Sequence, residues 1–132
     1  MKNEVMYVKK EDLEKIKSYI SSNDNIFDVE IDGKSCMYLS DYLTDISTKF
    51  KFPIIAKGLD GYNDWMTDLT WIDSNDIVII INDYEEFLCL DLLSKRKVIE
   101  NFEQSILPWW ESEVCDCMVE GKIRKFTVYL VS

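Results

Sequence analysis

The sequence contains no histidine, few glycines and prolines, and no long apolar run. Without an imidazole there is no Ser–His or Cys–His nucleophile pair and no His-ligated metal site. The longest unbroken apolar run, Ile77–Ile81, is far shorter than the ~20 residues that a membrane helix needs. The first residues also lack the apolar stretch of a signal peptide. These absences disfavour an enzyme and a membrane-spanning protein.

Basic side chains are also scarce, with 15 against 25 acidic ones in 132 residues and a net charge of −10. Residues 1–26 hold five acids and five lysines, so residues 27–132 carry the whole excess. From Gly58 to Ser94 there are nine acids and no Lys or Arg. Proteins bind nucleic acids and anionic membranes through clusters of their own basic residues, which this acidic chain lacks. A basic protein is therefore the better partner for it. We interpret Lys95–Lys97 as a solvated helix face.

The four cysteines, Cys36, Cys89, Cys115 and Cys117, form no C-x-x-C motif. The lone C-x-C at residues 115–117 would need distant thiolates to complete a zinc site, and free cysteines are usually small buried hydrophobes. We therefore predict no metal and no cofactor, and a cytoplasmic protein whose thiols stay reduced.

Length and an apolar fraction near one half suit one domain with a real core and a terminal appendage. Residues 1–26 read as an extension, with an extended piece at Val5–Val8 and a helix over residues 11–21. In that helix, Leu13, Ile16 and Ile20 form one apolar stripe. A turn-rich break over residues 21–25 separates this extension from a main domain at residues 27–132.

The main domain alternates strand and helix patterns. Strands are predicted at 27–31, at 77–81 (buried on both faces) and at 122–131, with a weaker hairpin partner at 115–119. Helices are predicted at 38–50, 60–70, 87–93 and 95–107, with Pro108 interrupting the last before Trp109-Trp110. We read these two tryptophans as core residues, with a partner-facing anchor as the alternative. The order predicts an α/β fold, a small, mostly parallel three-stranded sheet packed with helices, plus the N-terminal helical extension.

The helix predicted at 60–70 carries the most informative pattern. Its apolar stripe, Tyr62, Trp65, Met66 and Leu69, faces the core. Asp60, Asp64 and Asp68 lie at i, i+4 and i+8 on the opposite face, and no lysine at i±4 neutralises them. Each such like-charge pair costs roughly 0.2–0.5 kcal/mol, so helix stability alone does not favour the row. The row is either a solvated face or a site for a cationic partner; a catalytic carboxylate pair would need one acid buried.

The same segment resembles the barstar-like ribonuclease inhibitors. The resemblance covers about residues 27–132 in outline and is specific in residues 52–82. It begins with Phe52-Pro53 and a short glycine-containing loop, and it continues through Asp60, Asn63, Asp64, Asp68, Leu69 and Trp71. The order of the flanking strands and helices also fits that family.

The resemblance implies an inhibitor or immunity protein whose acidic helix and preceding loop occlude the basic active site of a nuclease. Asp60 and Asp64 then correspond to the family's two key acids, with Asp68, Gly58 and Ile55 as further partner contacts. Glu111 corresponds to a distal contacting acid, with Glu113 nearly as good a match. The loop is one residue shorter than in the family and has Ile54-Ile55-Ala56-Lys57 where aromatic residues and glycine are usual, which implies a different cognate partner.

Two other functions remain open from the residues. A non-inhibitory acidic adaptor domain would keep the fold and would tolerate the loss of Asp60 and Asp64. A hydrolase built on clustered carboxylates would need a divalent metal such as Mg²⁺ and would show metal-dependent turnover.

Overall fold

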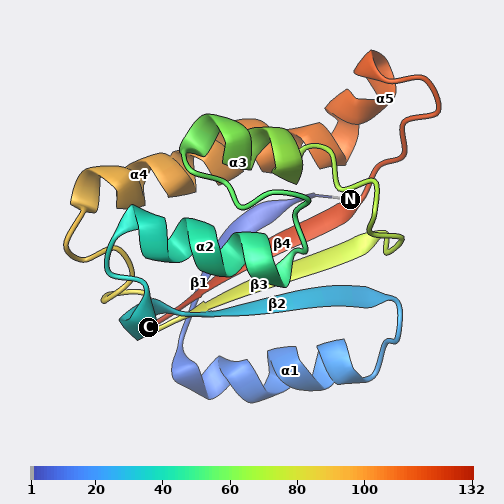
Figure 1. Ribbon diagram of the computed structural model, residues 1–132. Coiled ribbons are helices and arrows are strands. Elements are labelled where there is room, and N and C mark those ends of the chain that lie inside the picture. Colours follow the sequence, from blue (N-terminus) through green and yellow to red (C-terminus); the bar gives the residue numbers. More distant parts are fainter. Residues whose placement is uncertain (1) are drawn as a thin grey trace.

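A computed structural model describes residues 2–132 and contains one sheet of four parallel strands (Figure 1). The strands are β1 (Glu4–Val8), β2 (Ile26–Asp32), β3 (Asp76–Asn82) and β4 (Lys125–Val131), in the order β1-β4-β3-β2. The small parallel sheet is as predicted, but the prediction of three strands is wrong. The extended piece at Val5–Val8 is a fourth strand, which pairs with β4 at the sheet edge.

Helices cover both faces of the sheet (Figure 1). A 3-10 turn (Lys10–Asp12) leads into α1 (Leu13–Ser21), which lies alone on one face. The other face carries α2 (Leu39–Lys49), α3 (Leu59–Met66) and a long helical stretch. That stretch contains α4 (Leu92–Asn101), two π-helical segments (Phe102–Ile106 and Trp109–Glu113) and α5 (Val114–Cys117). The predicted extension therefore adds a strand and a covering helix to the same sheet, and the domain boundary at residue 26 remains a prediction.

Strand β3 is buried on both sides, as its β-branched run predicts. Ile77, Ile79 and Ile81 belong to the large core beneath α2, α3 and the long helical stretch. Val78 and Ile80 belong to a smaller cluster on the α1 side, which the apolar stripe of α1 covers. The side chains on both faces of β3 are thus removed from water. The two clusters attach the helices of each face to the sheet.

Three predictions about the C-terminal half are wrong. Residues 115–119 form no strand, because α5 takes them as far as Cys117. Residues 87–90 are turns, and α4 begins at Leu92 after its N-cap Asp91, whose side chain accepts the Ser94 N–H at 3.2 Å. Pro108 does not interrupt the helix. It has helical dihedrals between the two π-helical segments, whose wider turns accommodate a residue without an N–H.

The N-terminal segment is fixed at Asn3, which is buried. Its Nδ2 donates to the carbonyl oxygens of Leu107 and Arg124 at 3.1 and 3.0 Å, and its Oδ1 accepts the Phe126 N–H at 2.9 Å. One side chain thus joins β1, the long helical stretch and β4. Among residues 2–132 no helix is both long and apolar enough to span a bilayer.

Candidate functional site

The inward side of α3 is fixed by two side chains with no exposed surface, Tyr62 and Met66. The hydroxyl of Tyr62 is hydrogen-bonded to that of Tyr42 on α2 at 2.7 Å. Burial raises the pKa of both phenols, so both remain neutral and keep this hydrogen bond. Because α3 is only eight residues long, such tertiary contacts, rather than helix propensity, hold it in place.

The outward side of α3 presents Asp60 and Asp64, both exposed. Neither carboxylate belongs to any of the ion pairs found within residues 2–132. Gly58, the residue before the helix, is extended and provides no side-chain cap. Asp60 lies in the first turn, where the helix dipole favours an acid, whereas Asp64 lies beyond that turn. The predicted pair of acids therefore shares one solvent-facing side of a helix that is fixed from behind.

Asp68 does not extend this pair along the helix. The helix predicted to reach Thr70 ends at Met66, with Thr67 as its C-cap and the Thr67 hydroxyl donating to the Asn63 carbonyl at 2.8 Å. Leu69 follows with a φ of 48°, in the left-handed region. Asp68 is therefore half-buried in the turn after α3, and the continuous three-acid row predicted from the sequence is wrong.

The loop before α3 exposes two isoleucines. Ile54 is 67% and Ile55 47% exposed, although neighbouring Ala56 is buried and donates its N–H to the Ser47 hydroxyl at 3.0 Å. The backbone of this short loop is thus fixed to α2 while its apolar tip faces solvent. The predicted contact residue Ile55 lies in the segment that leads directly into Gly58 and α3.

Glu111 lies apart from these acids. Its carboxylate accepts the backbone N–H of Asn3 at 2.6 Å, and it lines a hollow with Asn3 and Glu103 that α3 does not reach. Glu113 is exposed further along the same helical stretch. The structure therefore does not bring Glu111 together with Asp60 and Asp64, and its carboxylate already has a structural partner.

Sequence reasoning missed a closer acid, Glu100 on α4. A groove of about 460 Å³ between α3 and α4 is lined by Leu59, Asp60, Asn63, Lys97, Glu100, Asn101, Gln104 and Ser105. Ser105 donates to the Asn63 side chain at 2.8 Å and so joins the two walls. The helical period does place Glu100 and Gln104 on one polar face. Only the packing of the two helices, which periodicity does not give, sets that face beside Asp60.

The C-terminal end of α3 is attached to the long helical stretch and to the segment before β4. Trp110 is buried and its Nε1–H donates to the Met66 carbonyl at 2.8 Å, as expected for a core residue. The Arg124 guanidinium donates to the Leu69 carbonyl at 3.0 Å and stacks over the Trp110 ring at 4.5 Å. Burial lowers the pKa of Arg124, although Asp73 and Asp68 oppose that shift. These contacts stabilise the turn that follows α3, and Asp68 lies in that turn instead of in the helix.

The arrangement suits recognition of a cationic surface. Within residues 2–132, no three His, Cys, Asp or Glu side chains gather where they could hold one metal ion. The site instead offers fixed negative charge next to apolar surface, which complements a basic protein. The charge comes from the exposed pair Asp60 and Asp64 and from Glu100 across the groove. The apolar surface is the loop tip at Ile54 and Ile55.

No curated protein matches this chain. The profile of the family described as Barstar (barnase inhibitor) matches residues 26–122, a span that includes β2, α2, α3, β3 and the long helical stretch. The match confirms the resemblance recognised in residues 52–82. The description of this family names inhibitors of a nuclease, not enzymes. With most of its residues covered by that profile, the chain belongs to the Barstar (barnase inhibitor) family.

Proposed function

We propose that this protein is an intracellular inhibitor that binds a basic ribonuclease and occludes its active site with α3. The observation that carries the proposal is the contrast within this helix. Tyr62 and Met66 are fully buried, while Asp60 and Asp64 are exposed and belong to no ion pair within residues 2–132. Like charges at i, i+4 destabilise a helix, so folding does not explain this arrangement. Binding of a cationic partner does explain it.

A ribonuclease active site is basic because it binds phosphates, and exposed carboxylates can take the place of those phosphates. In the proposed complex Asp64 is the central anchor and Asp60 a second charge-paired contact. The net charge of −10 accelerates encounter with a cationic enzyme. Gly58 and Ile55 form the adjoining loop contact, and Glu100 adds a further acid across the groove, on a wall that also carries Lys97.

The proposed inhibitor acts in the cytoplasm and protects the cell that makes or meets the nuclease. The four cysteines support a reducing compartment, because all are free thiols, and Cys115 and Cys117 are exposed. We retain Asp68 and Glu111 as lesser proposed contacts, since one lies in the turn beyond α3 and the other is bonded to Asn3.

The test is an inhibition titration against basic ribonucleases, with barnase and any basic ribonuclease encoded beside this gene as the first probes. We expect stoichiometric loss of RNA cleavage and an association rate constant that falls steeply with salt. Asp64→Ala weakens inhibition far more than Asp28→Ala, a matched substitution at an exposed carboxylate on β2. If both substitutions act equally, α3 is not the binding face; if no basic ribonuclease is inhibited, the inhibitor proposal fails.

A second candidate, a non-inhibitory interaction domain, is favoured by a different surface. Met37, Tyr38, Leu90, Leu92 and Leu93 are all exposed, and the Leu90 N–H donates to the Met37 carbonyl at 3.2 Å, which holds two of these segments together. Apolar side chains gathered on a surface mark contact sites. An adaptor would lose its partner when this patch becomes polar and would be unaffected by Asp64→Ala, the reverse of the inhibitor's behaviour.

A further inference from the structure

The sheet has two outer edges, at β2 and at β1 (Figure 1), and they are protected differently. On β2, the Glu30 carbonyl accepts a hydrogen bond from Lys49 Nζ at 2.6 Å, and the exposed Asp28 places a charge in the middle of the strand. Charged side chains of this kind keep a further strand from pairing with an edge. On β1, residues 5–8 include no charged residue, and Tyr7 is 69% exposed. The β1 edge therefore lacks the protection of the β2 edge.

The hydrogen bonds at the end of β1 show which of its main-chain groups face outward. The Val8 carbonyl accepts the Ser132 N–H at 3.1 Å, and the Lys10 N–H donates to the Ser132 carbonyl at 3.3 Å, so both residues face β4. Main-chain groups of successive residues point to opposite sides of a strand, so those of Val5 and Tyr7 face away from β4. Neither of these two N–H groups has an acceptor among residues 2–132.

Both ends of this outward edge are closed by side chains. The Asn3 N–H donates to the Glu111 carboxylate at 2.6 Å, and the Lys9 N–H donates to the Asp12 carboxylate at 3.2 Å. The two closed residues lie three positions before and three positions after Met6. The part of the edge that stays open is therefore symmetric about Met6.

That symmetry allows the strand to pair with a copy of itself. In an antiparallel pair centred on Met6, Val5 of each copy lies opposite Tyr7 of the other. Every N–H group of these residues then donates to a carbonyl of the facing residue, and the open part of the edge keeps no unpaired main-chain group. A shift along the strand sets Val5 or Tyr7 opposite itself, or opposite a residue whose N–H is already bonded. The centred register is thus the best one.

The charges at the two ends of β1 are complementary in the same register, which sets Lys9 of one copy opposite Asn3 of the other. Asn3 lines a hollow of about 500 Å³. Its lining includes one lysine and three acids, Glu4, Glu103 and Glu111. Lys9 is exposed and forms no ion pair within residues 2–132, so each copy brings a free lysine to the acidic hollow of the other. Residues 1–26 also have no net charge, so two chains of net charge −10 repel each other least at this edge.

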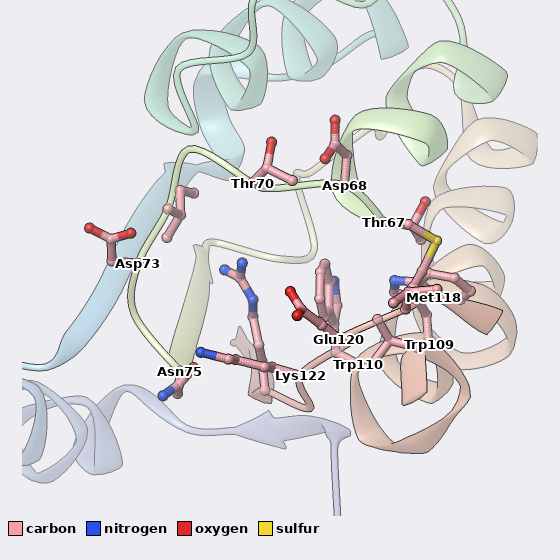
Figure 2. Close-up of a pocket in the computed structure, with 15 residues that line it drawn as sticks. Thr67, Asp68, Thr70, Asp73, Asn75, Trp109, Trp110, Met118, Glu120 and Lys122 are labelled. Carbon is pink, nitrogen blue, oxygen red and sulfur yellow. The ribbon is translucent and has the colours of Figure 1, made fainter. Parts of the chain in front are cut away.

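The β1 edge is separate from the surfaces around α3. A hollow of equal volume lies between the turn after α3 and the turn over residues 118–122 (Figure 2). Both acids and cations line it, so it favours no partner of one charge; they are Asp68, Glu120, Lys122 and Arg124. Neither this hollow nor the groove beside Asp60 is lined by a residue of β1. Pairing at β1 therefore leaves both surfaces of α3 open.

We propose that β1 is a dimerisation strand, through which two copies of this chain join their sheets into one continuous sheet. The two-fold axis passes between the Met6 residues of the two copies. Their side chains meet on the side of the sheet that α1 covers, because Val8, two residues on, packs in the cluster beneath α1. Tyr7 of each copy packs beside Val5 of the other on the opposite side. A two-fold axis repeats each of these contacts, as in most soluble homodimers.

The first test uses the residue on the axis. Met6→Lys and Met6→Glu each set two like charges opposite one another, and we expect each to weaken the dimer by roughly a hundredfold. An equimolar mixture of the two variants should recover it. Sedimentation equilibrium of the full chain over the micromolar range measures the mass. A wild-type chain that stays monomeric over that range, or a mixture of folded variants that stays monomeric, overturns the proposal.

Both variants are expected to fold, because Met6 is 37% exposed and belongs to neither core cluster. Circular dichroism checks this. A disulfide provides a second test of the register. The Met6 pair lies between two hydrogen-bonded pairs, where opposed Cα atoms are about 4.5 Å apart, close enough for a disulfide. Met6→Cys should therefore cross-link the dimer under mild oxidation by copper phenanthroline. Tyr7→Cys should cross-link no more than wild type, whose exposed Cys115 and Cys117 set the background. Equal cross-linking of the two variants overturns the register.

Matched charge changes locate the interface. Lys9→Glu should weaken the dimer by roughly tenfold, because the two-fold axis alters two contacts at once. Lys15→Glu makes the same change on the exposed surface of α1 and should leave the affinity within twofold. Leu92→Lys charges the exposed apolar patch and should also leave it unchanged. Dissociation by Leu92→Lys but not by Met6→Lys would place the contact on that patch and end the proposal.

The dimer does not depend on the proposed function. Asp64→Ala should leave the dimer affinity at the wild-type value while it weakens inhibition of the ribonuclease, and Met6→Lys should do the reverse. A monomeric wild type that inhibits a ribonuclease refutes the dimer alone. A dimeric wild type that inhibits no basic ribonuclease refutes the inhibitor alone.

Discussion

The two sides of α3 have opposite surroundings. The inward side, Tyr62 and Met66, has no exposed surface and is bonded to α2, whereas the outward side, Asp60 and Asp64, faces solvent and belongs to no ion pair within residues 2–132. Under the proposed function, conformation and recognition therefore belong to different residues of one short helix. The contrast teaches that either property can be altered while the other is kept, and the following experiments test that separation.

The largest effect is expected on the inward side, from Met66→Ala. Removing a fully buried methionine leaves a cavity and costs roughly 4 kcal/mol of the unfolding free energy. Urea unfolding followed by tryptophan fluorescence measures that loss. At a temperature where the variant remains folded, its affinity for a ribonuclease should stay close to wild type. A loss below about 1 kcal/mol would contradict the rigid attachment of α3.

Asp64→Ala is expected to have the reverse profile. The complex weakens by about 3 kcal/mol or more, because a basic group of the partner loses its central carboxylate. The unfolding free energy stays within about 0.5 kcal/mol of wild type, since the side chain is exposed and unpaired. Calorimetric titration and urea unfolding of the same preparation make the comparison. Comparable losses in both measurements would show that the two sides of α3 are not separable.

Tyr62→Phe tests the buried hydrogen bond between α3 and α2. The substitution leaves the Tyr42 hydroxyl without its partner in the core, which costs about 2 kcal/mol. Tyr42→Phe with Tyr62→Phe should cost less than the sum of the two single changes, because no hydroxyl is then left unpaired. Additive losses would show that the 2.7 Å contact contributes nothing to stability.

Alkaline pH should weaken the inward side. Burial raises the pKa of Tyr42 and of Tyr62 above the ordinary value of 10.0, so the folded state holds protons that the unfolded chain releases. Their contribution is therefore complete below pH 10 and is lost as the pH rises toward the folded values. Urea unfolding at pH 8, 9.5 and 11 should show this decline, and the double Tyr→Phe variant should show less of it. An equal decline in that variant would assign the effect to other groups.

The smallest effect is expected from Asp64→Asn, with a sign opposite to that of the inward substitutions. Relief of the i, i+4 repulsion with Asp60 raises the unfolding free energy by roughly 0.3 kcal/mol. Asp60→Asn gains less, because Asp60 also interacts favourably with the helix N-terminus. Thermal unfolding at low salt measures the difference in stability between the two variants. Destabilisation by Asp64→Asn would mean that this carboxylate supports the fold.

Much of the fold is predictable because single-element patterns are strong here. The β-branched run at 77–81 and the apolar spacing of residues 38–50 predict β3 and α2 to within one or two residues. The end of α3 is not predictable in this way. Leu69 continues the apolar period and is fully buried, yet it reaches the core from a left-handed turn rather than from the helix. The apolar period predicts which side chains are buried. It does not predict which backbone conformation brings them into the core.

The site is only partly predictable for a related reason. Asp60 and Asp64 belong to one helix, so their spacing alone places them on one side. Glu100 joins the acids of α3 only through the packing of distant segments, which one sequence does not reveal. Glu111 shows the opposite case, because an acid chosen from the family pattern is occupied by the Asn3 main chain, which lies outside the matched residues.

The pairing of β1 with β4 has a consequence for how the protein is made. Within residues 2–132, residues 4–8 pair as a strand only with residues 127–131, so this edge of the sheet closes between segments far apart in the sequence. On a ribosome, β1 emerges before β4 and stays unpaired until β4 has left the exit tunnel. Such long-range closure slows folding. We therefore expect ribosome-bound chains stalled before residue 125 to leave β1 sensitive to protease, and protection to arise once residues 127–131 have left the exit tunnel.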